Sequence, residues 1–301
     1  MAGASRRGVP ADANDLSFET AFDHFLRSGD RSTLVDYLLL RSNLPGPRGN
    51  LELVHRFADT VTANGLERGE QVLELCVTFI NGTPPAASVG NPMEFIPVCG
   101  LVGLGGLGSV RIGAKYPYYH KAIDRLKGSA RDPRWRVREG VAMGLQRIIA
   151  ARPKPALRSL SGWVAAGDWS EMRAVAAGVA EPPLLKDPVV AQESLRLHRN
   201  IMDHVLYALT QPSNGSGSRS TGSEAFQKLT QCLEYSLSVV VAAQPEDGFA
   251  YLDELASSLP PNGGKYSAGA ILHRLLKENL KKNRLKRYFP EHVENVMTYL
   301  Q

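Results

Sequence analysis

The chain is poor in cysteine. It contains three, Cys76, Cys99 and Cys232, at wide spacings within apolar segments. An odd number at such spacings fits neither a disulfide framework nor a four-ligand zinc site, and we expect each cysteine to serve as a small buried side chain. We therefore expect a cytoplasmic protein, and we predict no metal and no other cofactor.

Long apolar runs are also missing. The longest candidate, residues 95–110, contains five glycines and is shorter than the ~20 residues that span a bilayer. The opening residues, MAGASRRGVPADAND, have charge but no apolar stretch after it, unlike a secretory signal. We expect a disordered tail over residues 1–14 and no membrane partner.

Signatures of catalysis are scarce. Neither the H-E-x-x-H zinc motif nor the G-x-S-x-G nucleophile elbow occurs, and His198 and His204 are spaced wrongly for two ligands on one helical face. The segment Gly103-Leu-Gly-Gly-Leu-Gly108 spells the G-x-G-x-x-G of dinucleotide-binding folds, but that motif requires a preceding strand, which the sequence does not indicate. Close helix packing explains these glycines better, and no catalytic residue is predicted.

The sequence does carry a strong helical signal. Strand-like alternation is nearly absent, and apolar residues recur at three- and four-residue spacings, as in the stripe Val137, Val141, Leu145, Ile148 and Ile149. We expect about twelve to fourteen helices of ~10–20 residues, joined by short Gly/Pro turns. Because 43% of the residues are hydrophobic and 22% are charged, a sizeable core can form.

Helix start signals recur at a regular distance. Asn91-Pro92, Asp132-Pro133 and Asp187-Pro188 each place a capping side chain before a proline, and Asp168 supplies a fourth cap. The starts at 91, 132 and 168 are separated by 41 and 36 residues. A recurrence of about 40 residues in an all-helical chain is typical of stacked helical hairpins.

The residues inside these units resemble the HEAT-repeat family of the ARM/HEAT superfamily, whose units carry an Asp six residues before the Arg of a Val-Arg pair. Asp132 and Val137-Arg138 have this spacing, whereas Asp168 and Met172-Arg173 are one residue short of it. Small residues follow in both helices. The resemblance implies an all-α, right-handed α-solenoid of stacked antiparallel helix pairs with a large partner on its concave face.

One break in composition interrupts the helical pattern. Residues 211–223, QPSNGSGSRSTGS, are rich in Gly and Ser, as in a mobile loop or linker. We expect HEAT-like repeats over residues 15–210, a loop at 211–223, and further helical repeats of the same solenoid over 224–301. A separate domain after the loop is the alternative.

The net charge of +5 is concentrated in two basic islands. Residues 111–138 hold nine Lys or Arg against two Asp, and residues 271–288 hold seven against one Glu. Such islands can hold phosphate or an acidic partner, or they can be solvated helix faces. The candidate partner-binding residues are Arg131, Arg134, Trp135, Arg136, Trp169, Lys277, Lys281, Lys282, Arg284 and Arg287.

The favoured function is a non-enzymatic HEAT-like interaction or scaffold module with a protein partner. The alternative is a nucleic-acid-binding protein, because Trp, Asp and Arg near residues 131–173 resemble the residue types that AlkD-like DNA glycosylases, a branch of HEAT-like proteins, use on alkylated bases. That alternative requires both islands on one concave face, beside an open aromatic ring and a free carboxylate. In the simpler interpretation, Trp135 and Trp169 pack between repeats, Asp132 and Asp168 cap helices, and Arg138 and Arg173 brace the stack.

Overall fold

The computed structural model describes residues 16–82, 91–210, 220–259 and 268–300. Within these ranges the chain is all-α, and its only β-type pairing is an isolated bridge between Ile112 and Lys115. The helices of the first half are α1 Phe18–Ser28, α2 Ser32–Leu40, α3 Leu51–Ala63, α4 Gly69–Asn81, η2 Pro92–Glu94, α5 Phe95–Gly108, α6 Tyr119–Ser129 and α7 Trp135–Ala151. Those of the second half are α8 Pro153–Ala166, α9 Trp169–Val179, η3 Leu184–Lys186, α10 Pro188–Thr210, α11 Glu224–Ala243, α12 Pro245–Ser257, α13 Ala268–Leu280, α14 Asn283–Lys286 and α15 Pro290–Thr298.

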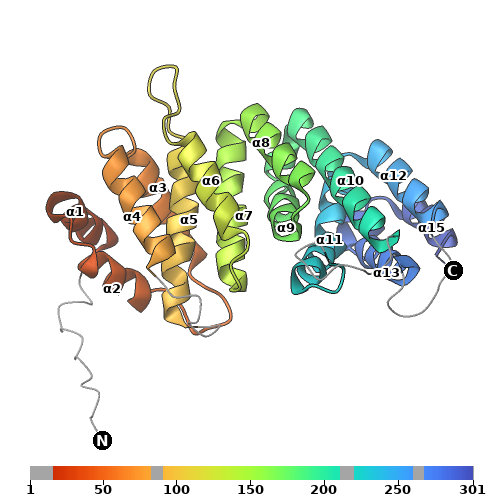
Figure 1. Ribbon diagram of the computed structural model, residues 1–301, viewed down its shortest axis with the longest axis horizontal. Coiled ribbons are helices and arrows are strands. Elements are labelled where there is room, and N and C mark those ends of the chain that lie inside the picture. Colours follow the sequence, from red (N-terminus) through yellow and green to blue (C-terminus); the bar gives the residue numbers. More distant parts are fainter. Residues whose placement is uncertain (1–15, 83–90, 211–219, 260–267, 301) are drawn as a thin grey trace, which may run out of the picture.

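The helices follow one another along the long axis of the molecule, from α1 and α2 at one end to α15 at the other (Figure 1). Two rows run along this axis. In the first, which we call the odd row, each of α3, α5, α7, α9, α11 and α13 packs against the next. The second, or even row, consists of α4, α6, α8, α10 and α12. Helix α4 packs against α5, and each of the other four packs against at least two helices of the odd row.

The predicted capping residues act close to the expected positions. Asp168 Oδ1 accepts hydrogen bonds from the backbone N–H groups of Ser170 and Glu171, and Asp187 Oδ1 accepts one from Val189 at 2.9 Å. These bonds satisfy donors that the first turn leaves unpaired. Asn91 caps the 3₁₀ turn η2 in place of α5 itself.

The start at Asp132 differs from the expectation. Helix α7 begins at Trp135, and Asp132 instead closes a turn by accepting from the backbone N–H of Arg134 at 2.9 Å. The Asp-Pro pair therefore initiates the turn that leads into the helix. The helix itself starts two residues later than a direct cap would place it.

Glycines of α5 place this helix at the centre of the core. All fourteen of its residues are buried. A Cβ atom on Gly105 would lie 2.3 Å from the carbonyl oxygen of Gly144 in α7, and one on Gly106 would lie 2.9 Å from the carbonyl oxygen of Ala58 in α3. The G-x-G-x-x-G segment is thus helical and serves close packing, as its sequence context indicated.

Two domain predictions concern residues outside the described ranges. The tail expected at 1–14 lies there, as do residues 211–219 of the Gly/Ser-rich stretch. Thr210 ends α10 before this stretch and Glu224 begins α11 after it. Helix α11 packs against both α9 and α10, so the helices on the two sides of the stretch are in direct contact.

Candidate partner-binding surface

Helices of the odd row present side chains to solvent. They recur at helical spacing, as Glu139, Met143 and Arg147 do on α7 and Arg173 and Ala177 do on α9. We call this surface the odd-row face and define it by Asp59, Trp135, Glu139, Arg147, Arg173, Gln231 and Tyr235, all exposed or half-buried.

Ion pairs between helices of the odd row connect the residues of this face. Arg147 of α7 donates to Asp59 of α3 at 2.6 Å and also contacts the ring Nδ1 of His55 at 3.1 Å. Because α5 lies between α3 and α7, this arginine crosses over the recessed glycine helix. Farther along the row, Arg173 of α9 pairs with Glu139 of α7.

His55 lies next to this crossing. Partial burial and the neighbouring Arg147 charge lower the pKa of its imidazole. Both effects disfavour the imidazolium form, so this side chain adds no positive charge to the face at neutral pH. Glu52, His55, Arg56, Asp59, Thr60 and Ala63 of α3 line a shallow hollow here.

The cations of the first basic island are largely engaged within the chain. Arg134 is 3% exposed and donates to Asp132, and Arg136 is 9% exposed and donates to Glu94 at 3.2 Å. Arg131 is exposed but contacts Asp168 and Glu171, both at 3.0 Å. The hydrogen bond and the charge of Asp168 raise the pKa of Arg131. The three arginines of this island that were predicted to bind a partner are therefore held in intramolecular ion pairs.

The two candidate tryptophans differ in exposure. Trp169 is 3% exposed, with its ring 5.2 Å from that of Phe226 on α11, so it packs between helices of the odd row. Trp135 is 43% exposed at the start of α7, and the Arg136 guanidinium lies 4.4 Å from its ring centroid. Only Trp135 of this pair is accessible to a partner.

The nearby carboxylates are occupied. Asp168 caps α9 and accepts from Arg131, while Asp132 accepts from both the backbone and the guanidinium of Arg134. Neither carboxylate is therefore free to act on a bound substrate in the way that the glycosylase-like alternative requires.

The second basic island is more accessible. Lys281 and Arg287 are exposed, and Lys277, Lys282 and Arg284 are half-buried. Lys281, which directly follows α13, pairs with Glu278 of that helix at 2.7 Å. Arg284 and Lys282 instead approach Tyr235 of α11, with the Arg284 guanidinium 4.4 Å and the Lys282 ammonium 5.9 Å from its ring centroid. This part of the candidate set thus adjoins the odd-row face.

Tyr235 was not among the residues predicted from the sequence. It is 51% exposed, and its hydroxyl lies 2.6 Å from Arg284 Nη2. The two residues are 49 positions apart, and few aromatic residues interleave with the charges of 271–288 in the sequence. Nothing local in the sequence pairs this tyrosine with those cations, because the fold alone brings α14 against α11.

Arg138 of α7 and Arg173 of α9 are two further arginines whose charges interact. Arg138 is 8% exposed and donates to the carbonyl oxygens of Asp132 and Pro133. Burial, and then the positive charge of Arg173, lower the pKa of Arg138. The side chains of Arg138 and Arg173 each keep one buried N–H without a hydrogen-bond partner. Both arginines brace the helices, as the simpler interpretation of the sequence held.

His198 lies buried away from this surface. Its Nδ1 donates to the Ser194 carbonyl oxygen at 2.9 Å and its Nε2 accepts from the Ser236 hydroxyl at 3.0 Å. Burial lowers its pKa to about 4, so the ring is neutral. Among the described residues, no group of three or more His, Cys, Asp or Glu is placed to hold a metal ion.

None of the described helices is both long enough and apolar enough to cross a bilayer. Comparison of the chain with protein-family models, with curated proteins and with solved structures gives no match.

Proposed function

We propose that the chain is a HEAT-like, right-handed α-solenoid of stacked antiparallel helix pairs, and that it acts as a non-enzymatic interaction or scaffold module. The partner in this proposal is a protein, and it binds along the odd-row face. The regular alternation of odd-row and even-row helices along the sequence supports this architecture. A helix pair of this kind cannot bury its own apolar face, so neighbouring pairs must stack.

The observation that carries the proposal is the long solvent-facing side of the odd row. It extends from Asp59 on α3 to Tyr235 on α11, and interhelical ion pairs such as Arg147–Asp59 hold its helices in register. A surface built on rigid helices that are connected by ion pairs can bind a partner with little loss of its own conformational entropy.

The nucleic-acid alternative has less support. It requires free cations near Arg131, Arg134 and Arg136, and each of these side chains already has a carboxylate partner. It also requires a free carboxylate beside an open ring, whereas Asp132 and Asp168 are hydrogen-bonded. A cation neutralised within the chain contributes little to phosphate binding.

A cytoplasmic location is part of the proposal. Cys76, Cys99 and Cys232 are free thiols, and Cys76 and Cys99 are buried. Burial raises the pKa of both buried thiols, which keeps them protonated and unreactive.

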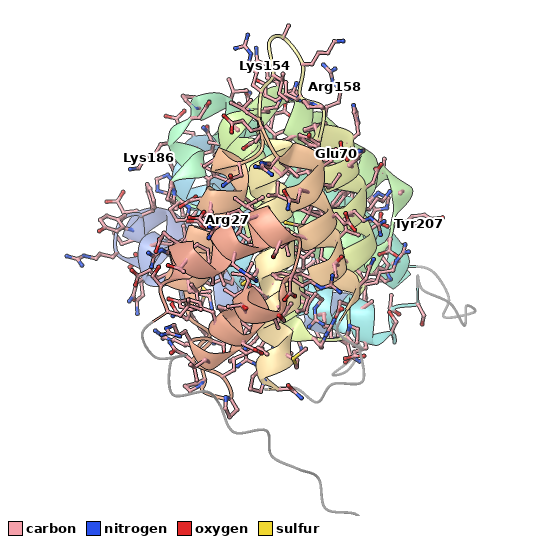
Figure 2. All side chains as sticks on the ribbon, turned by 90° about the vertical axis from the view of Figure 1, so that its left-hand side faces the viewer. Arg27, Glu70, Lys154, Arg158, Lys186 and Tyr207 are labelled. Carbon is pink, nitrogen blue, oxygen red and sulfur yellow. The ribbon has the colours of Figure 1, made fainter. Side chains whose placement is uncertain are left out.

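Site-specific photo-crosslinking in cells of the source organism tests the proposal. A photoreactive phenylalanine analogue replaces Gln231 on the odd-row face, and the matched control carries it at Lys154 of α8. Both positions are exposed; Lys154 projects from the edge of the molecule (Figure 2). We expect a discrete protein adduct from position 231 alone. Equal adducts from both positions, or none from position 231, would contradict the proposal, and a nucleic-acid adduct would favour the alternative.

A further inference from the structure

Tyr235, Lys282 and Arg284 form a small basic and aromatic cluster, which we call the Tyr235 clamp. Arg284 Nη2 donates to the tyrosine hydroxyl at 2.6 Å, and its guanidinium lies over the ring. These two contacts hold a long side chain in one position.

The clamp cations form no ion pair within the described residues, although Glu278 is close enough to Lys282 for the Lys282 charge to contribute to lowering the Glu278 pKa. In contrast, Arg274 and Lys281 nearby pair with Glu234 and Glu278. Arg284 as a whole is half-buried, and because its Nη1 is buried, a ligand can reach the guanidinium only on its solvent-facing side. A partly exposed guanidinium with no ion-pair partner favours binding a carboxylate.

Further positive charge surrounds the clamp. Lys286 and Arg287 are exposed on the next turn and have no ion-pair partner among the residues that the structure describes. The four cations at 282, 284, 286 and 287 therefore form a local field that attracts a negative partner. This field lies at one end of the odd-row face, where Tyr235 belongs to both surfaces.

We propose that the Tyr235 clamp binds an acidic segment of the partner protein, with Arg284 on one carboxylate and Lys282 on a second one. This inference rests on the proposed function and names the chemistry of the partner. A hydrogen bond from a charged donor to a carboxylate is stronger than one between neutral groups. Because Tyr235 orders Arg284 in advance, binding loses less side-chain entropy.

The geometry favours an acidic peptide over a nucleic acid for two reasons. Arg284 lies over the Tyr235 ring, so less of the ring surface remains on which a base could stack. The basic surface is also short, because the arginines at 131, 134 and 136 are engaged in intramolecular ion pairs. A duplex would need a longer track of free cations.

Fluorescence anisotropy with the full chain tests the inference. The probe is a fluorescein-labelled peptide of about twelve residues with Glu at alternate positions, and the control probe carries Gln in place of Glu. The test variant is Lys282→Gln/Arg284→Gln. The matched control is Lys154→Gln/Arg158→Gln, which removes the same charge from two exposed cations of α8 (Figure 2).

We expect the Glu peptide to bind at low ionic strength and the Gln peptide not to bind. The affinity should fall about tenfold in the clamp variant and stay within about twofold of the original in the control. Circular dichroism establishes that both variants are folded. Tyr235→Phe should weaken binding less than Tyr235→Ala, because the phenylalanine ring still supports Arg284.

Three outcomes would overturn the inference: no binding of the Glu peptide, equal weakening by both double variants, or clamp-dependent binding of a duplex of about 20 base pairs that exceeds binding of the peptide. The crosslinking experiment separates these failures from failure of the proposed function. A protein adduct at position 231 with no peptide binding would reject the acidic segment but keep the interaction module. Clamp-dependent peptide binding with no adduct at position 231 would reject the interaction module but keep the preference of the clamp for acidic peptides.

Discussion

Gly105 of α5 lies directly against Gly144 of α7, so that the backbones of the two helices touch. A Cβ atom at position 105 would lie 2.3 Å from the carbonyl oxygen and 2.5 Å from the Cα atom of Gly144. No rotation of a side chain can relieve such a contact, because both atoms belong to the backbone. This approach recesses α5 and lets Arg147 reach across it to Asp59.

We expect Gly105→Ala to destabilise the protein by about 3 kcal/mol, since the extra methyl group must push α7 away from α5. Urea denaturation followed by circular dichroism measures the effect. The matched control is Gly162→Ala in α8, where an added Cβ meets nothing within 4 Å. That variant should gain about 0.5–1 kcal/mol, because alanine favours the helix. Equal losses at both positions would remove the packing argument.

Much of the fold could be predicted from the sequence, because helical periodicity and capping are local. The glycine run was correctly assigned to helix packing, and Asp168 was correctly placed as a cap. The start of α7 was displaced by two residues, since the Asp132 side chain can close a turn as readily as it can cap a helix. The expected number of twelve to fourteen helices was confirmed for the described residues, where the four-residue α14 is the one α-helix beyond fourteen.

The candidate surface was harder to predict. Charge density marked Arg134 and Arg136, yet both are buried, because their partners Asp132 and Glu94 neutralise them. Counting charges along a chain cannot distinguish a cation that faces solvent from one that pairs 42 residues away, as Arg136 does with Glu94. Tyr235 escaped prediction for the same reason, since its contact with Arg284 is made only by the fold.

The Glu94–Arg136 pair gives a second prediction. Glu94 is fully buried and its partner is nearly so. Glu94→Gln should cost about 3 kcal/mol, because it leaves a buried guanidinium without a counter-charge. The double variant Glu94→Leu/Arg136→Met should be more stable than Glu94→Leu alone, since it removes both charges together. If the loss of stability in the double variant equals the sum of the losses in Glu94→Leu and Arg136→Met, measured in the same denaturation assay, the two charges do not depend on each other.

His198 makes stability depend on pH. Its pKa is about 4 in the folded protein and about 6.5 in an unfolded chain. Because the unfolded state binds the proton first, stability should fall as the pH drops from 6.5 toward 4, by about 2–3 kcal/mol from this group alone. His198→Gln removes the titrating ring, so the difference in unfolding free energy between the original protein and the variant should change over this window. Parallel pH curves would reject the assignment.

Asn279 of α13 is a fully buried amide that fixes α13 against α11. Its Oδ1 accepts from the Ser238 backbone N–H, and its Nδ2 donates to the carbonyl oxygens of Leu233 and Leu275, each at 2.8 Å. Asn279→Leu keeps the approximate volume but leaves these buried groups with fewer partners, so we expect a loss of about 2–4 kcal/mol. The control is Asn283→Leu at an exposed position of α14, and it should change stability by less than about 0.5 kcal/mol.

The same substitution should also affect the Tyr235 clamp. Asn279 bonds to α11 on both sides of Tyr235, and Arg284 follows it by five residues. If the amide sets the position of α14 relative to α11, Asn279→Leu should weaken binding of the Glu peptide under conditions in which circular dichroism shows the chain to be folded. Unchanged affinity in the folded variant would mean that packing of Leu285, which is fully buried on α14, is sufficient to place Arg284 over the ring.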